Sequence, residues 1–278
     1  MAKQVGLFNL RGKIENKSFY KTAGVPETVI RGIPEGLSAR VKTADEYANT
    51  RLNNAEFKQA NGIATFGFNA VPSRKASMMR RFAIAEMTKK GLEYIKEGTG
   101  NWGQRLPVAT FDNIIVDLLE NRAKSGPYQG EYGNLEVTPP ELPAGQYQIN
   151  LTIPSNVATD LLGKGIDGFY ALVVKGAMAE VLDADGFVRQ HFGVSSIFPH
   201  DIEVDPEDES PSLLSSFVAS YATLGMSQAG FTAAADAANN GMYAIISFIP
   251  YRTIGTQRHS LYEYATYAAL ALGAIPTE

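Results

Sequence analysis

The sequence predicts an α+β protein, in which a helical N-terminal part with a leading β-hairpin is followed by a β-sandwich-like C-terminal part. Residues 43–124 carry apolar side chains at helical spacing, whereas residues 146–272 are dominated by short alternating or continuous apolar runs. Residues 126–145 between them are rich in Gly and Pro, which is typical of a linker. We therefore expect a basic region of hairpin and helices at residues 1–125, a linker at 126–145 and an acidic β-rich domain at 146–278.

Short strands are expected near the N-terminus. Residues 5–8, 18–20 and 28–30 are apolar, aromatic or β-branched, and this composition favours strands. Gly12 and Gly24 stand between these segments and favour turns. A leading hairpin is the simplest arrangement of such short pieces.

Three amphipathic helices are expected next. The first begins with a capping box, in which Thr43 is the N-cap and a glutamate follows three residues later, and Gly62 is its expected weak point or end. The second begins with Ser73 as its N-cap and stops at Gly98. The third covers residues 110–124, where apolar side chains recur at core spacing.

The C-terminal half is expected to consist mainly of strands. Residues 146–153 alternate polar and apolar side chains, which predicts a half-buried strand. Residues 168–174 and 242–249 are continuously apolar and predict core strands, and residues 179–182 predict a further short strand. Residues 260–272 fit either a strand or a helix, and we favour a strand because a neighbouring strand needs a partner.

Composition excludes several classes of protein. The chain has 278 residues and no cysteine, which removes disulfides, thiolate catalysis and cysteine-based metal sites. Its 45% apolar and 19% charged residues are ordinary for a folded protein and argue against disorder. No apolar run approaches the ~20 residues of a membrane helix, and the first residues lack the apolar segment of a secretory signal. We therefore expect no membrane association.

The net charge of −4 conceals a strong asymmetry. Residues 1–125 hold 20 Lys/Arg and 12 Asp/Glu, a net of +8, and residues 126–278 hold 5 and 17, a net of −12, which together give −4. Such a split is expected for nucleic-acid contact at the basic end, or for subunits that associate with opposite charges facing each other. Two solvated surfaces of unequal composition are the alternative.

The sequence carries no recognisable catalytic signature. Its three histidines stand in no triad context, and it contains neither a G-x-S-x-G elbow nor an H-E-x-x-H or H-x-x-x-H pair. Residues 162–165 contain a glycine-lysine pair but lack the first glycine and the Ser/Thr of a P-loop. Residues 200–209 are acidic but lack the glycine and the regular spacing of a calcium loop. We therefore predict no enzyme activity, no bound metal and no cofactor.

Two charged segments are candidate contact surfaces. The basic surface lies on or beside the second helix and comprises Arg74, Lys75, Arg80, Arg81, Lys89 and Lys90. Such side chains could contact phosphates in a salt-sensitive, sequence-independent way, although acidic residues at helical spacing could also pair with several of them. The acidic surface is an expected loop that could face another subunit, and it comprises Asp201, Glu203, Asp205, Glu207, Asp208 and Glu209.

The N-terminal residues form a pattern made of 6–8 (GLF), 11–21 (RGKIENKSFYK), Arg31, 41–43 (VKT), 48–51 (ANTR) and Phe57. Over about the first 70 residues this pattern resembles a family of uncharacterised proteins from Bacteroidetes and their phages. That family opens with a G-x-x-x-G-K-x-G-N hairpin, continues with a V-x-R strand and a K-T-x-x-Q-x-x-x-R-x-x-F helix start, and has a β-rich C-terminal half. Glu15 replaces the third glycine here, and Glu46 or Tyr47 stands where glutamine is expected. The resemblance implies a non-enzymatic structural component, such as a phage virion protein.

Together these observations predict a self-assembling structural protein of a phage virion, such as a coat, ring or connector subunit, which is assembled in the host cytoplasm. Its expected partners are copies of itself and other virion proteins, with the basic half of one subunit against the acidic loop at residues 200–209 of another. One alternative is a packaging accessory that uses the basic surface for non-specific nucleic-acid contact. Another is a glycan- or receptor-binding module in which Tyr262, Tyr264 and Tyr267 stack on sugars.

Overall fold

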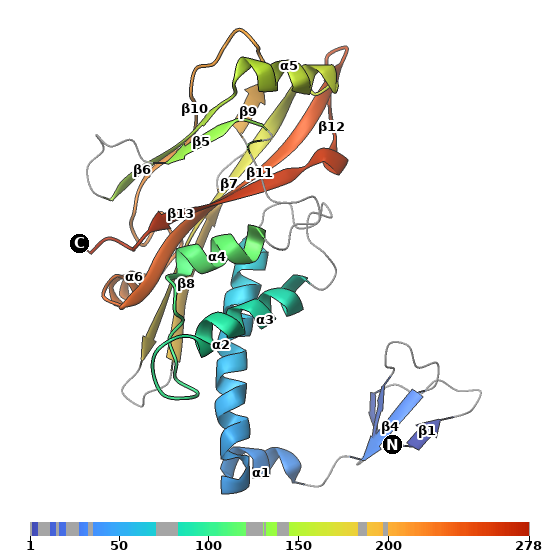
Figure 1. Cartoon of the computed structure of the whole chain (residues 1–278), viewed down its shortest axis with the longest axis vertical. Helices are drawn as coiled ribbons and strands as arrows, with labels where there is room; N and C mark the ends of the chain where they lie inside the picture. The colour runs from blue at the N-terminus through green and yellow to red at the C-terminus, as the bar shows by residue number, and fades with distance from the viewer. Residues whose placement is uncertain are drawn as a thin grey trace. The chain divides into compact units, whose positions relative to one another are not determined.

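The structure is a computed structural model that describes residues 2–4, 12–14, 17–20, 28–32, 36–70, 83–120, 130, 132–137, 145–182, 188–196 and 200–277. It confirms the predicted α+β class, because a leading β-hairpin and helices occupy the N-terminal part and the C-terminal half is rich in strands (Figure 1). The chain divides into two compact units, Met1–Asn54 and Ala55–Glu278.

The first unit contains a four-stranded antiparallel sheet. Its strands are β1 (Ala2–Gln4), β2 (Gly12–Ile14), β3 (Lys17–Tyr20) and β4 (Thr28–Gly32), in the order β1-β4-β3-β2. β2 and β3 form the predicted hairpin, in which Lys13 pairs with Ser18. The strands predicted at 18–20 and 28–30 are confirmed, whereas the segment 5–8 lies outside the described residues.

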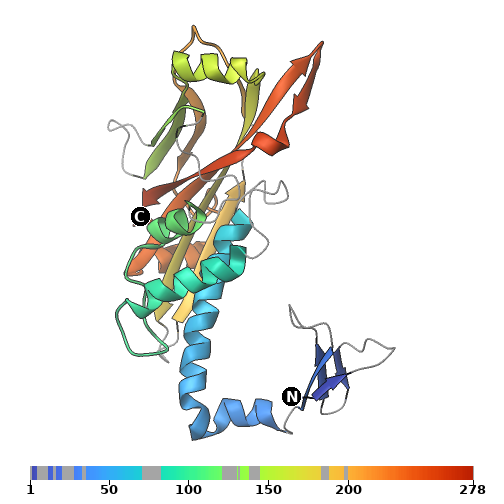
Figure 2. The same cartoon turned by 45° about the vertical axis from the view of Figure 1, so that its right-hand side comes forward.

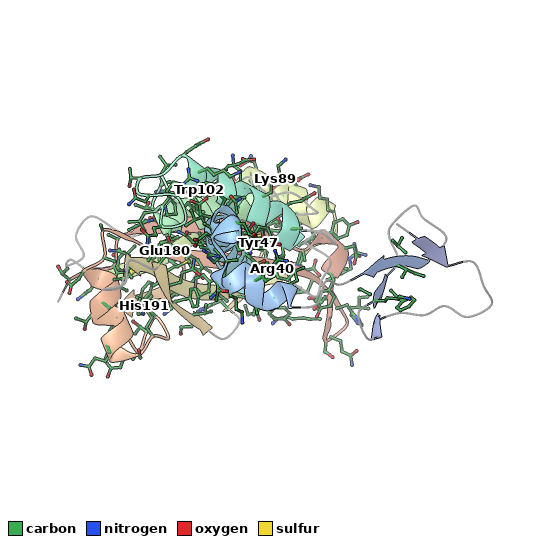
Figure 3. All side chains as sticks on the ribbon, turned by 90° about the horizontal axis from the view of Figure 1, so that it is seen from below. Arg40, Tyr47, Lys89, Trp102, Glu180 and His191 are labelled. Carbon is green, nitrogen blue, oxygen red and sulfur yellow. The ribbon has the colours of Figure 1, made fainter. Side chains whose placement is uncertain are left out.

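Two short helices lead into the long helix of the N-terminal part. They are α1 (Leu37–Thr43) and the 3-10 helix η1 (Asp45–Tyr47), and α2 (Ala48–Ala70) follows. The predicted capping box is therefore wrong, since Thr43 ends α1 and its hydroxyl donates to the carbonyl oxygen of Ala39 at 3.1 Å. Glu46 pairs instead with Arg40, which also lies 5.9 Å from the ring centroid of Tyr47 (Figure 3). The carboxylate of Glu46 is thus bound to a guanidinium instead of the backbone N–H of Thr43 that a capping box requires.

α2 continues past Gly62, so the expected end of the helix at this glycine is wrong. A Cβ at Gly62 would stand 2.2 Å from Oε1 of Gln190, and the glycine therefore permits close approach between helix and sheet. α3 (Ala83–Lys96) ends before Gly98 as predicted, while its expected start at Ser73 lies outside the described residues. α4 (Phe111–Glu120) confirms the body of the third helix.

A six-stranded antiparallel sheet, here called the long sheet, forms the centre of the second unit. Its strands are β7 (Gly168–Leu182), β8 (Val188–Ser196), β9 (His200–Glu203), β11 (Asn239–Ile254), β12 (Gln257–Ser260) and β13 (Thr266–Gly273). β7 and β11 pair from Gly168 opposite Tyr251 to Glu180 opposite Asn239. β8 and β9 pair with β7, whereas β12 and β13 pair with β11.

The long sheet gives the outcome of two strand predictions, one for residues 168–182 and one for residues 260–272. The segments predicted separately at 168–174 and 179–182 form the single strand β7, because Gly176 packs under an aromatic ring instead of breaking the strand. A Cβ at Gly176 would lie 2.3 Å from Cζ of Tyr243. The strand favoured within 260–272 is confirmed as β13, which follows the 3-10 helix η2 (Tyr262–Tyr264).

A smaller sheet packs on one face of the long sheet, as the sandwich-like prediction requires. Its strands are β5 (Asn134–Val137), β6 (Gln146–Thr152) and β10 (Ser212–Val218), in the order β10-β6-β5. β6 confirms the strand predicted at 146–153. The core between the sheets includes Ile149, Leu151, Phe169, Val173, Leu214, Phe217, Ile246 and Phe248. Helices α5 (Ser155–Gly163) and α6 (Gln228–Ala235) complete this side, and α5 has no counterpart among the predicted elements.

The other face of the long sheet is covered by α4 together with α3 and the part of α2 that follows Asn54 (Figures 1 and 2). This second core includes Ile63, Met87, Phe111, Ile114, Leu118, Val174, Met178, Tyr243 and Ile245. Neighbouring residues of β7 alternate between the two cores, with Val173 facing the small sheet and Val174 facing the helices. Burial on both faces explains why β7 and β11 are apolar almost throughout.

The grouping of the helices therefore differs from the sequence-based division. The sequence placed all three helices in a basic region that ends at residue 125, before the linker at 126–145. In the structure the boundary between the compact units lies between Asn54 and Ala55, and α3 and α4 belong with the long sheet. The amphipathic helices join the sheet because its second face would otherwise expose a row of apolar side chains.

Candidate functional site

The first half of the predicted acidic loop is a strand rather than a loop. Asp201 and Glu203 lie on β9, beside Arg258 of β12. Nη2 of Arg258 lies 2.7 Å from Oε1 of Glu203, and the same guanidinium pairs with Asp201. The hydroxyl of Tyr251 donates to Oδ1 of Asp201 at 2.9 Å, and Arg258 stacks over the Tyr251 ring at 4.8 Å. Two of the six predicted acidic residues are thus bound to a cation of their own chain.

The second half is an exposed turn, here called the acidic turn (residues 205–209). Backbone N–H groups of residues 207 and 210 donate to Asp205 and Asp208, each at 2.9 Å. The N–H of Ser155, at the start of α5, donates to Oε1 of Glu209 at 2.7 Å. Hydrogen bonds to backbone N–H groups hold the pKa of Asp208 and of Glu209 below the ordinary value. Within the described ranges, no ion pair joins the acidic turn to a cation.

The basic surface is only partly described. Arg74, Lys75, Arg80 and Arg81 lie outside the described residues. Lys89 of α3 is exposed (Figure 3), whereas Lys90 pairs with Glu93 at 3.5 Å and lies 5.4 Å from the ring centroid of Tyr94. The described part of this helix therefore presents a mixed surface of cations and carboxylates.

A buried polar cluster that sequence reasoning missed lies between α2 and the long sheet. Glu180 of β7, which is labelled in Figure 3, is 2% exposed. Its two carboxylate oxygens accept from Nε2 of Gln59 at 2.5 Å and from Nε2 of Gln190 at 2.7 Å. Burial raises the pKa of Glu180 to about 7, although the two amide hydrogen bonds act in the opposite direction. This is a carboxyl group that titrates near neutral pH inside the fold.

A second buried carboxylate, that of Glu56, lies on α2 one helical turn before Gln59. Glu56 is 1% exposed, and Arg105 binds it through Nε at 2.7 Å and Nη2 at 2.8 Å. The N–H of Gly103 adds a third hydrogen bond at 2.9 Å. Burial alone would raise the pKa of Glu56, but the bonds from Arg105 and Gly103 hold it below the ordinary value. The loop after α3 is thereby fastened to α2.

One sequence signal pointed toward these groups. Glu56, Gln59 and Ile63 follow one another at three- and four-residue spacing, so two polar residues share the buried face of a helix. The partners Glu180 and Gln190 are distant in the sequence, and no local pattern could identify them.

The three tyrosines considered for glycan stacking do not form one surface. Tyr262 and Tyr264 are each 55% exposed on η2. Tyr267 is fully buried, and its hydroxyl donates to the carbonyl oxygen of Leu119. Tyr267 therefore cannot serve as a stacking platform.

The glycine-lysine segment that the sequence analysis compared with a P-loop lies at the end of a helix. Residues 162–165 span the C-terminal end of α5, which lies at Gly163. Lys164 pairs with Asp160 at 2.7 Å, and a helix C-terminus repels phosphate. In the ranges that the structure covers, His, Asp and Glu side chains form no group of three or more that could hold a metal ion. No helix among the described residues has the length and hydrophobicity to cross a membrane.

The chain matches no protein-family description, and a comparison with curated proteins finds no significant match.

Proposed function

We propose that this chain is a self-assembling structural subunit of a phage virion, such as a coat, ring or connector protein. The observation that carries the proposal is the acidic turn. Its carboxylates are exposed and have no cation partner among the described residues, while residues 1–125 carry a net charge of +8. We infer that the basic region of one subunit binds the acidic turn of the next.

The hydrogen bonds within the acidic turn support this role. Asp205, Asp208 and Glu209 each accept a hydrogen bond from a backbone N–H, so the turn holds three of its four carboxylates in place without a partner. A surface that is already ordered loses less conformational entropy on binding than a flexible acidic tail would. Electrostatic complementarity between such surfaces favours correct pairing and rapid association.

The scaffold behind the turn also suits a subunit that is packed among copies. Both faces of the long sheet are covered, by the small sheet and by the helices. Figure 2 shows the hairpin of β11 and β12 projecting beside α5, and Arg258 on this hairpin binds the β9 strand that leads into the acidic turn. The acidic turn is therefore anchored to the sheet through β9 and to α5 through Glu209.

Light scattering of the purified chain at low and high salt tests the proposal. We expect a discrete oligomer that weakens as salt rises, because exposed charge pairs are screened. The triple variant Asp205→Asn, Glu207→Gln, Asp208→Asn should dissociate at lower salt, since it keeps the hydrogen-bond acceptors of the turn and removes three charges. The control variant Asp160→Asn, Asp236→Asn, Glu263→Gln removes three exposed charges elsewhere and should assemble like the natural chain.

A monomer at every salt concentration, or an oligomer indifferent to both salt and the triple variant, would contradict the proposal. A monomer that binds DNA with a steep salt dependence in filter binding would support the packaging accessory instead.

A further inference from the structure

We propose that the Glu180 carboxyl group acts as a proton-dependent latch, meaning that its protonation strengthens the packing of residues 55–70 of α2 on the long sheet. The latch joins three elements: Gln59 comes from α2, Glu180 from β7 and Gln190 from β8. Each carboxylate oxygen accepts one hydrogen bond from a side-chain amide. The donors are Nε2 of Gln59, at 2.5 Å, and Nε2 of Gln190, at 2.7 Å. The proposal concerns the fold itself and does not depend on the proposed function.

Further helix–sheet contacts continue along α2 from the point where Gln59 binds this carboxyl group. Nε2 of Gln190 also donates to the carbonyl oxygen of Gln59, at 3.1 Å, so the β8 side chain binds the helix backbone directly. One turn further along α2, Gly62 lies against Gln190. The next turn places Phe66 on Phe192, with ring centroids 5.1 Å apart. A change at the carboxyl group therefore acts on a contact that extends along the helix.

No charged side chain among the described residues offsets an ionised Glu180, whose pKa reflects burial and the two amides alone. Two of the charged groups on the surrounding elements have partners of their own. Glu56 of α2 pairs with Arg105 of the following loop, and Asp112 of α4 accepts from a backbone N–H of β13. Across the sheet, the residue of β11 opposite Glu180 is the uncharged Asn239. The ionised latch is consequently a buried charge held only by amide dipoles.

The sign of the pH dependence follows from the raised pKa. The pKa of Glu180 is about 7 in the docked state, against an ordinary value of 4.5. The docked state therefore binds the proton more tightly, and docking is strongest at low pH. As pH rises from about 4.5 to 7, the docking equilibrium should weaken by up to about tenfold per pH unit, and it should level off above that range. The pKa of Glu56 is lowered, so the contribution of Glu56 to the pH dependence has the opposite sign and falls mainly at and below its ordinary value of 4.5.

Hydrogen exchange of the full chain between pH 5 and pH 8, corrected for the intrinsic pH dependence of amide exchange, tests the latch. We expect protection of amides in residues 55–70 to fall by roughly tenfold per pH unit up to pH 6.5 and then to level off. Protection in residues 242–248 of β11 should stay constant. The matched variant Glu180→Gln has the size of the protonated residue and cannot ionise, so its protection should not change with pH.

The same pH dependence in Glu180→Gln and in the natural chain would overturn the proposal. Parallel loss of protection in residues 55–70 and 242–248 would also overturn it, because the whole unit would then be unfolding. Should Glu180→Gln fail to fold, carbon NMR of the natural chain decides the question. Titration of the Glu180 carboxyl near pH 7 supports the latch, and titration near 4.5 refutes it.

Discussion

Replacement of Glu56 by Gln would remove the charge that fastens the loop after α3 to α2. Glu56 accepts three hydrogen bonds, two from Arg105 and one from the N–H of Gly103. Gln keeps the size and one acceptor oxygen, but its NH₂ group would face a guanidinium N–H. Arg105 would lose one acceptor and its ion pair with Glu56, and the loop would lose its best anchor on the helix.

The expected loss of stability in Glu56→Gln depends on how deeply the Glu56–Arg105 ion pair is buried. Removing one partner of a buried ion pair costs about 3–5 kcal/mol. The Glu56 side chain is 1% exposed and that of Arg105 is 22% exposed, so water can solvate part of the remaining guanidinium. We therefore expect Glu56→Gln to lower the free energy of unfolding by about 2–4 kcal/mol.

Urea unfolding followed by tryptophan fluorescence measures this loss where it occurs. Trp102 is the single tryptophan of the chain, and it precedes Gly103 in the fastened loop. The control is Asp160→Asn, which breaks the exposed pair with Lys164, whose side chains are 63% and 56% exposed. That change should cost less than about 0.5 kcal/mol.

Acid should weaken the effect of Glu56→Gln. The pKa of Glu56 is lowered in the folded chain, so its stabilising contribution is present above the ordinary pKa of 4.5 and is lost as the pH falls through the folded-state value. The difference between Glu56→Gln and the natural chain should therefore shrink between pH 7 and pH 3. The reasoning would be refuted if Glu56→Gln at pH 7 cost no more than Asp160→Asn.

Other substitutions test the packing of the second unit, with urea unfolding as the measurement throughout. Gly241→Ala should destabilise by about 1–3 kcal/mol, because its Cβ would stand 2.4 Å from the backbone N of Asp112; Gly163→Ala, which meets nothing within 4 Å, should be neutral or slightly stabilising. Tyr243→Phe should leave stability unchanged or raise it, because the buried Tyr243 hydroxyl has no hydrogen-bond partner among the described residues. Tyr267→Phe should cost about 1 kcal/mol, because its hydroxyl binds a backbone carbonyl of α4; equal effects of the two tyrosine changes would contradict this account.

Local sequence determined much of the secondary structure. Alternation of polar and apolar residues identified β6, because one side of that strand faces the core and the other does not. Helical spacing identified α3 and α4, and Gly98 was correctly expected to stop the former. These features depend on residues only a few positions apart in the sequence, so a local pattern of side chains is enough to predict them.

Glycines and caps were less predictable, because their role depends on what lies opposite. Gly62 and Gly176 interrupt their local patterns, yet α2 and β7 run through both. In each case another element, Gln190 or the Tyr243 ring, occupies the space that a side chain would need. Thr43 had the right spacing to glutamate for a cap, but the chain placed it at a helix end.

Only the tertiary structure decided what the helices cover and which polar groups meet. An apolar stripe shows that a helix is buried on one side, but it does not identify the second face of the long sheet as its partner. Gln59 meets Glu180 across 121 positions, and Gln190 meets the Gln59 backbone across 131. By itself the sequence determined the α+β class, most strands and the opposite charges of the two halves. The buried carboxyl between α2 and the sheet arises only when folding brings these distant segments together and excludes water from between them.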